Sequence, residues 1–140
     1  MAKPNSPRQD IAGALRIVII LDSNVLIYAA QPEHGALRQW LGSRTCGVSL
    51  ASKIEVLGFH KLTAIDKAFF LRAFAILSVF PIIPAVAETA IRLRQIRKMS
   101  LGDSIIAATA LEYQCPLATR NIDDFVWIDG LIIINPFEAG

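Results

Sequence analysis

A continuous apolar run, Ile17–Leu21, constrains the fold of this chain more than any other feature of its sequence. Most of its residues are β-branched, and an unbroken run of this length is typical of a strand that is buried on both faces. Such strands occur in parallel sheets, whose two faces are covered by helices. The run therefore predicts a central strand in an α/β protein.

Further short apolar runs alternate with segments of helical periodicity. The other predicted strands are Gly47–Leu50, Val79–Ile83, Pro116–Thr119 and Leu131–Ile134. The predicted helices are Val25–Ala30, Ala36–Leu41, Ser52–His60, Thr63–Leu77, Pro84–Met99 and Leu101–Tyr113, with a helical turn at Asn121–Phe125. Pro81 cannot donate a ladder hydrogen bond, which places its strand at an edge. This alternation predicts a parallel sheet that is covered on both faces.

Composition favours one globular domain. Of the 140 residues, 54% are hydrophobic and 19% are charged, a balance that excludes intrinsic disorder. Residues 1–16 are polar and predict an N-terminal tail, so that residues 17–140 form the single domain. The formal charge of +2 permits a nucleic-acid partner without arguing for one.

Hydropathy and cysteine usage bear on the compartment. The mean hydropathy is +0.47, yet no apolar run approaches the ~20 residues that a membrane span requires, so no membrane partner is expected. Cys46 and Cys115 are far apart and match no metal-ligand pattern, which favours two buried thiols in a reducing, cytoplasmic environment.

Acidic residues occur where the predicted strands end. Asp22 directly follows the first strand, Glu55 lies in the helix after the second, and Asp124 follows the fourth. Asp103 opens the helix that leads into the fourth strand. Ligands bind at the carboxyl ends of the strands in open parallel sheets. A carboxylate cluster there suits a hard divalent cation such as Mg²⁺.

Helix capping offers a second explanation for the same acids. Ser52-x-x-Glu55 and Ser100-x-x-Asp103 both match the capping-box pattern. Asn121-x-x-Asp124 has a similar spacing, and Asp22 is itself a good N-cap residue. Both interpretations stay open, because a capped carboxylate remains ionised and can still bind a cation.

Four motifs in order resemble one family. They are Ile19–Tyr28 (IILDSNVLIY), Ser49–Gly58 (SLASKIEVLG), Leu101–Ala110 (LGDSIIAATA) and Ala118–Phe125 (ATRNIDDF), the last followed by Gly130-Leu131 and Asn135-Pro136-Phe137. Through these motifs the chain resembles the PIN-domain ribonucleases, and most closely the VapC-type toxins of bacterial toxin–antitoxin pairs. The resemblance runs from Ile17 to Phe137.

The resemblance implies a fold and an activity. The fold is a three-layer α/β/α sandwich with a short central parallel sheet. The activity is that of a Mg²⁺- or Mn²⁺-dependent endoribonuclease that hydrolyses RNA phosphodiester bonds. The implied partners are an RNA substrate, a cognate antitoxin and a second copy of the chain in a homodimer.

The resemblance also implies roles for individual residues. Asp22 and Asp103 look like the main metal ligands, with Glu55 as a third ligand or a group that positions water. Asp124 is expected to complete the catalytic set. The remaining implied contributors, which would orient a carboxylate or contact the substrate, are Ser23, Asn121 and Arg120.

Other interpretations remain. Asn121 stands where some relatives have Asp, which motivates a non-catalytic PIN-fold module that binds RNA or protein. A phosphotransfer domain is disfavoured, because the chain has neither a D-x-D motif after the first strand nor a phosphate-binding G-x-x-x-x-G-K-[ST] loop. A basic cluster suits either a phosphate-binding face or a solvated helix; its members are Arg92, Arg94, Arg97 and Lys98. Trp40 and Trp127 are interpreted as packing residues.

Overall fold

The computed structural model describes residues 17–137, so the predicted tail at residues 1–16 lies outside the described residues. Five parallel strands form one sheet in the order β3-β2-β1-β4-β5. Their bounds are β1 Val18–Leu21, β2 Thr45–Ser49, β3 Ser78–Phe80, β4 Leu117–Ala118 and β5 Ile133–Ile134. Ile20 of the central strand pairs with Gly47 on one side and Leu117 on the other.

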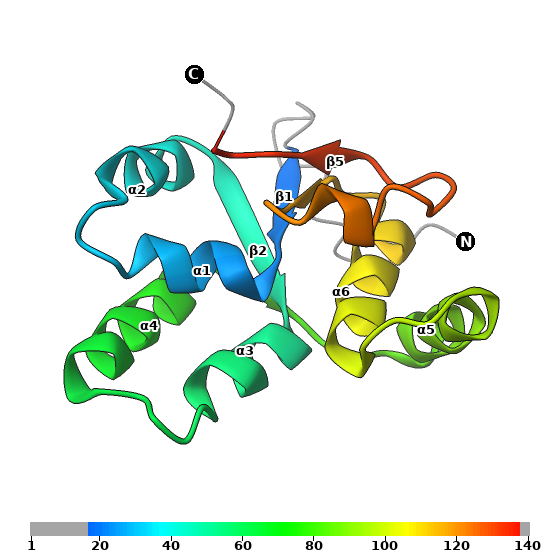
Figure 1. Ribbon diagram of the computed structural model, residues 1–140, viewed down its shortest axis with the longest axis horizontal. Helices are drawn as coiled ribbons and strands as arrows, with labels where there is room; N and C mark the ends of the chain where they lie inside the picture. The colour runs from blue at the N-terminus through cyan, green and yellow to red at the C-terminus, as the bar shows by residue number, and fades with distance from the viewer. Residues whose placement is uncertain (1–16, 138–140) are drawn as a thin grey trace, which may run out of the picture.

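Helices cover both faces of the sheet, as Figure 1 shows. Their bounds are α1 Ser23–Ala29, α2 Gly35–Gly42, α3 Leu50–Leu57, α4 Ala64–Ile76, α5 Pro84–Ile96 and α6 Leu101–Glu112, with a 3₁₀ turn, η1, at Ile122–Asp124. Helices α1, α2 and α4 lie on one side of β1 and β2, and α5 and α6 lie on the other. The expected three-layer α/β/α sandwich is confirmed.

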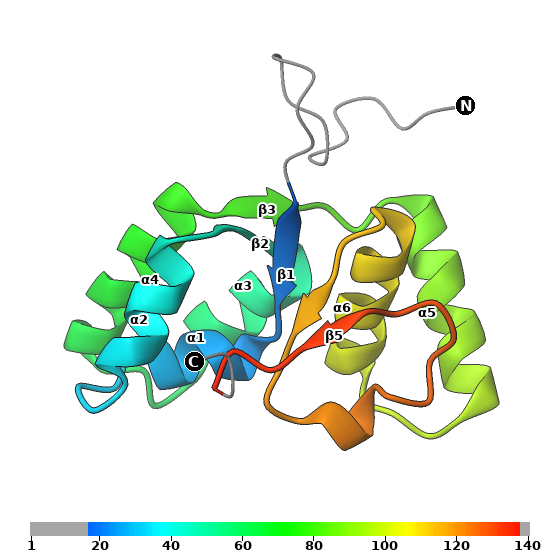
Figure 2. The same ribbon diagram turned by 90° about the horizontal axis from the view of Figure 1, so that it is seen from above.

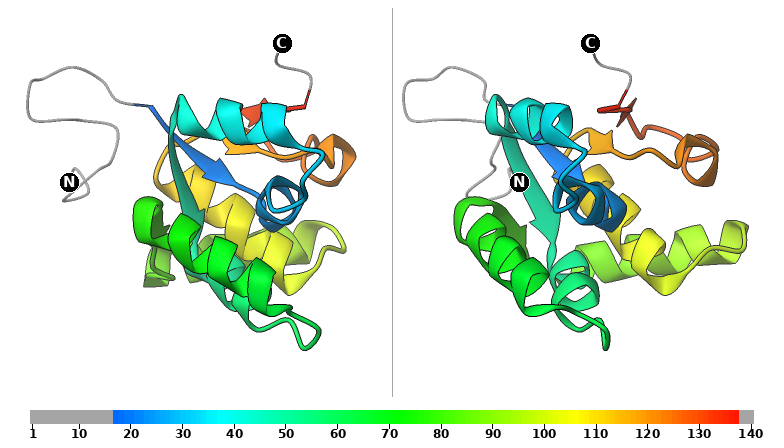
Figure 3. Two further views of the ribbon diagram at one scale, coloured as in Figure 1. Left: turned by 90° about the vertical axis from the view of Figure 1, so that its left-hand side faces the viewer. Right: turned by 60° about the vertical axis from the view of Figure 1, so that its left-hand side comes forward.

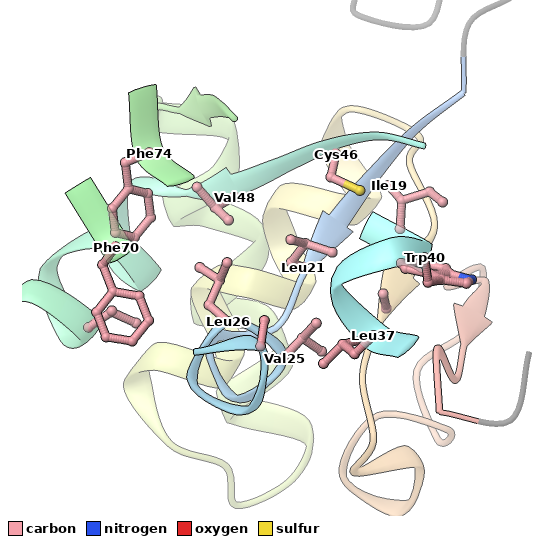
Figure 4. Close-up of a cluster of buried hydrophobic side chains, with 13 residues drawn as sticks. Ile19, Leu21, Val25, Leu26, Leu37, Trp40, Cys46, Val48, Phe70 and Phe74 are labelled. Carbon is pink, nitrogen blue, oxygen red and sulfur yellow. The ribbon is translucent and has the colours of Figure 1, made fainter. Parts of the chain in front are cut away.

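Each face of the sheet has its own core. Ile19 and Leu21 of β1 point toward α1, α2 and α4, where they belong to one buried cluster with Leu26 and Phe70 (Figure 4). Val18 and Ile20 alternate to the other face, where they join residues of α5, α6 and β4. Because β1 is buried from both sides, its sequence has no polar position, which is what the apolar run predicted.

Some element boundaries differ from the sequence-based expectation. Helix α3 begins at Leu50 because Ser49, not Ser52, is its N-cap and accepts a hydrogen bond from the backbone N–H of Ala51. The expected capping box at Ser52 is therefore wrong. Strand β3 is at the sheet edge, as Pro81 predicted, but it ends at Phe80, one residue before that proline.

None of the helices within residues 17–137 has the length and apolar character needed to cross a membrane. Cys46 and Cys115 are both buried, as expected.

Candidate active site

The carboxyl ends of the central strands gather residues from distant parts of the sequence. Strand β1 points at the start of α1, and β2 leads directly into α3, as Figures 2 and 3 show. The loop after β4 leads into η1 at this edge of the sheet. Helix α6 packs against α3, and the first turn of α6 therefore lies at the same edge of the sheet, where Gly102 approaches Glu55. Parallel strands thus bring the four predicted acids toward one site.

Asp22 is the most buried of these acids, with 3% of its surface exposed. It occupies the N-cap position of α1, but its side chain makes no capping hydrogen bond. Instead its Oδ2 accepts a hydrogen bond of 2.8 Å from the Thr119 hydroxyl, at the end of β4. Burial raises the pKa of the Asp22 carboxyl to about 6, an effect that Thr119 opposes and the charges of Asp103 and Glu55 reinforce. The capping explanation therefore does not account for Asp22.

Glu55 is exposed on α3 and is held from two sides. The Ser23 hydroxyl lies 2.8 Å from Glu55 Oε1 and 2.9 Å from Ser52 Oγ. One hydroxyl carries one proton, so Ser23 donates to the carboxylate and can accept the proton of Ser52. On the other side stands Gly102 of α6, where an added Cβ would lie 2.5 Å from Glu55 Oε2. The absence of a side chain at Gly102 thus lets Glu55 approach α6.

Asp103 lies in the first turn of α6. Its backbone N–H donates to the Ser100 hydroxyl at 3.1 Å, so the expected N-cap at Ser100 is confirmed. Burial raises the pKa of the Asp103 carboxyl above its ordinary value, and the charges of Asp124 and Glu55 act in the same direction. Asp103 and Asp124 line one cleft of about 440 Å³. A cap and a site residue are therefore compatible at this position.

The electrostatics link all four acids. The charges of Asp103 and Glu55 raise the pKa of Asp22, and the charges of Asp124 and Glu55 raise the pKa of Asp103. Within residues 17–137, no three Asp, Glu, His or Cys side chains stand close enough to form a complete cation site in their present positions. Like charges separate unless a cation offsets their repulsion. The donor set, all hard carboxylate oxygens with one buried member, could hold a divalent cation such as Mg²⁺.

Asn121 and Arg120 lie beside the acids. Asn121 precedes η1 without a side-chain capping bond, so the capping role expected for it is not formed. Arg120 is exposed, and its guanidinium carbon lies 5.1 Å from the ring centroid of Tyr28 and 4.9 Å from that of Phe137. Arg120, Asn121 and Asp124 line a shallow pocket of about 340 Å³. These contacts keep the positively charged guanidinium of Arg120 at the border of the acidic site.

Sequence reasoning missed three residues that hold the acids in place. Thr119 and Asp22 are 97 positions apart, so no local pattern connects them. Ser52 supports Ser23 across a separation of 29 positions. Gly102 carried a visible signal, because a glycine inside the first turn of a helix weakens that helix and calls for a packing reason.

Comparison with known proteins identifies the fold. The sequence profile of the PIN domain matches residues 19–130. The chain belongs to the PIN domain family. Members of this family are generally nucleases. No curated protein sequence has a significant match to the chain.

Several solved structures share this PIN fold. A toxin–antitoxin complex from Klebsiella pneumoniae contains a chain with 29% identity and a TM-score of 0.70, covering 86% of this chain and 98% of that one. VapBC2 from Rickettsia felis, bound to a DNA fragment from the VapBC2 promoter, gives 20% identity and a TM-score of 0.75, covering 85% and 98%. FitAcB from Neisseria gonorrhoeae gives 23% identity and a TM-score of 0.71, covering 86% of this chain and 99% of that one. The resemblance to VapC-type PIN toxins is confirmed.

Proposed function

We propose that this PIN domain is a Mg²⁺- or Mn²⁺-dependent endoribonuclease that acts as the toxin of a type II toxin–antitoxin pair. The observation that carries the proposal is the convergence of Asp22, Glu55, Asp103 and Asp124 from four segments at one edge of the sheet. Two of these carboxyls have raised pKa values, and one is buried. Such an arrangement is costly for the folded chain, so a functional reason is expected.

Each acid has a role in this proposal. Asp22, Glu55 and Asp103 would hold the cation, which when bound lowers the pKa of water and offsets the negative charge of a phosphodiester. Thr119 holds the Asp22 carboxylate through its hydrogen bond, and Ser23 does the same for Glu55. Asp124 contributes a further carboxylate beside Asp103. Arg120 and Asn121 line a pocket with Asp124, and in this proposal they would contact the substrate.

Cleavage of RNA tests the proposal directly. The purified protein is incubated with total tRNA, rRNA and mRNA in Mg²⁺, in Mn²⁺ and in EDTA. We expect cuts that depend on the cation and that fall by roughly 100-fold or more in the Asp103→Asn variant, because a ligand carboxylate is lost. Asp123→Asn is the matched control, since Asp123 is exposed and lines the same cleft without belonging to the proposed ligand set.

The controls separate this function from its alternatives. Equal cutting by the Asp103→Asn variant would point to a contaminating nuclease. RNA binding without cleavage in any cation would establish the non-catalytic module that Asn121 suggests. Retention of Asp22, Glu55 and Asp103 favours the catalyst, because a module that only binds RNA gains nothing from carboxylates that repel one another, one of them buried.

An apolar groove supports the proposed antitoxin partner. It lies between α1, α2 and α4 and has a volume of about 320 Å³. Leu26, Phe69 and Ile76 contribute to its wall, and Ile76 is 86% exposed. Apolar surface of this kind typically marks a protein interface. Solved structures that share this fold include toxin–antitoxin complexes, so we propose that the cognate antitoxin covers this groove.

Replacing Ile76 by Gln should weaken antitoxin binding by about 10- to 100-fold, because burial of an isoleucine side chain contributes ~1.5–3 kcal/mol. Ile65→Gln is a matched control on the same helix, since Ile65 is 83% exposed but does not line the groove. Titration calorimetry with the antitoxin measures both. Equal affinities for the two variants would contradict the proposed interface.

A second apolar surface supports the proposed homodimer. Ile91 of α5 is 52% exposed and Leu101 of α6 is 60% exposed, and both line a depression shared by these two helices. A second copy of the chain would cover them. We also propose a cytoplasmic location, which the proposed RNA target and the burial of Cys46 and Cys115 support.

A further inference from the structure

The cleft that Asp103 and Asp124 share also contains residues that the proposed chemistry does not use. Arg97 and Lys98 follow the end of α5 and line this cleft, and Trp127 follows η1 and lines it too. The cleft thus joins two acids of the candidate site to two cations and an indole ring. Its volume of about 440 Å³ is within the range of clefts that hold small ligands.

The indole of Trp127 is fixed relative to the acids. Its Nε1–H donates to the backbone carbonyl of Asp124 at 2.9 Å. One part of the side chain packs against the core between the sheet and α6, as the sequence-based packing role predicted. The ring is nevertheless only half-buried, and the guanidinium carbon of Arg97 lies over it, 5.5 Å from the ring centroid. A group outside the core can therefore contact one face of the Trp127 ring, as Arg97 does.

We propose that Trp127 is a stacking platform for a nucleobase of single-stranded RNA beside the bond that is cut, and that Arg97 binds the phosphate of that nucleotide. This inference rests on the proposed ribonuclease function and names how its substrate is held. Aromatic side chains beside basic residues are the usual means of holding single-stranded nucleic acid, because every base has a π-face.

Binding requires Arg97 to leave the indole. Arg97 is exposed and ends its helix, so its side chain is free to turn. A guanidinium–phosphate pair with charge-assisted hydrogen bonds is stronger than an exposed cation–π contact, so phosphate displaces the ring as the partner of Arg97. The same movement uncovers the ring face for a base. The cation and the aromatic ring thus pair with each other in the free protein and with one nucleotide in the complex.

Charge favours a nucleotide over a small anion in this cleft. Asp103, Asp123 and Asp124 repel a lone anion, and the two cations Arg97 and Lys98 offset that repulsion only in part. A nucleotide places its phosphate at Arg97 and gains a second, uncharged contact from its base at Trp127. The Asp and Glu side chains of an acidic peptide have no π-face to stack on the indole, and the acids of the cleft repel them.

Tryptophan fluorescence tests the platform separately from catalysis. The probe is a mixed-sequence RNA octanucleotide, added in Mg²⁺ to the full chain carrying Asp103→Asn so that the RNA stays intact. We expect the RNA to quench the emission of Trp127. In that parent, Trp127→Ala should weaken RNA binding by about 5- to 100-fold, the range found for loss of one stacked base. Trp127→Phe should abolish the quenching yet keep most of the affinity.

Matched variants control for folding and for charge. Trp40→Phe should change neither quenching nor affinity, because Trp40 is buried in the opposite core and its Nε1 has no hydrogen-bond partner among residues 17–137. Arg97→Gln should weaken RNA binding and reduce its salt dependence. Arg72 lies in α4 and lines the apolar groove between α1, α2 and α4, so Arg72→Gln should change the RNA affinity little. An abasic oligonucleotide of equal length should bind the Trp127→Ala variant and its parent equally.

The outcomes separate this inference from the proposed function. If the wild-type protein cleaves RNA and Trp127→Ala leaves the affinity and the KM unchanged, the platform is overturned and the nuclease stands. If RNA quenches Trp127 but no cation supports cleavage, the platform stands without the nuclease. If no RNA binds, or if only the antitoxin quenches Trp127, the platform is overturned.

Discussion

In metal-free buffer at about pH 7.5, the Asp22→Asn variant should unfold at a higher temperature than the wild-type protein. Burial raises the pKa of Asp22 from its ordinary value of 3.8 to about 6 in the folded chain. A difference of that size corresponds to roughly 3 kcal/mol, which is the cost of keeping this carboxylate ionised. Asparagine removes the charge and can still accept the Thr119 hydrogen bond. We expect a gain of about 2–3 kcal/mol, or roughly 10 °C.

The pH dependence of stability follows from the same pKa. Between the ordinary value of 3.8 and about 6, folded Asp22 binds more protons than the unfolded chain does. The free energy of unfolding therefore falls as the pH rises through this window, and the full cost is present above it. The raised pKa of Asp103 acts in the same direction. Chemical denaturation in EDTA across this pH range measures the slope, which should be smaller in Asp22→Asn.

Addition of a divalent cation should make the wild-type protein unfold at a higher temperature than the Asp22→Asn variant, which reverses their order in metal-free buffer. A cation that binds the carboxylates stabilises only the folded state, so Mg²⁺ or Mn²⁺ should raise the unfolding temperature of the wild type and leave Asp22→Asn almost unchanged. Asp129→Asn is the control, since Asp129 is exposed. A wild type that is as stable as Asp22→Asn in EDTA at every pH would show that Asp22 carries no such cost.

The fold was predictable because its main signals are local. An unbroken apolar strand such as Val18–Leu21 can be buried only between two helical layers, and the helices that cover it carry their own periodicity. The first turn of α3 was less predictable, because Ser49 and Ser52 are equally good capping residues by type. Only the end of β2 decides between them, and that end is set by pairing with β3.

The candidate site was predictable as a set of residues and not as a geometry. Strand ends and family motifs indicate which acids gather. They do not reveal that Thr119 holds Asp22, because that hydrogen bond joins two strands that are adjacent only after folding. The same applies to the Trp127 contact with Arg97, which joins the segment after η1 to the end of α5. Such contacts depend on tertiary packing, which no sequence pattern encodes.

Replacing Gly102 by Ala should lower RNA cleavage by about 10- to 100-fold while leaving the chain folded. The new Cβ would lie 2.5 Å from Oε2 and 2.9 Å from Cδ of Glu55. A carboxylate at the end of a flexible side chain can move away, so the cost falls on the position of Glu55 rather than on stability. Displacement of a catalytic group by about 1 Å can reduce a rate by this factor. Alanine also favours a helix over glycine by up to ~1 kcal/mol, so the unfolding temperature should not fall.

A double-mutant cycle shows whether Glu55 transmits the effect. If Gly102→Ala acts by moving Glu55, it should have no further effect on cleavage in a Glu55→Gln background. Gly42→Ala is the matched control, because a Cβ at Gly42 in α2 meets nothing within 4 Å. A full and additive loss in the Glu55→Gln background would mean that Gly102 serves the substrate or α6 itself. If Gly102→Ala lowers cleavage only in the chain that keeps Glu55, the role of Gly102 is to leave the space that lets Glu55 lie near Asp103.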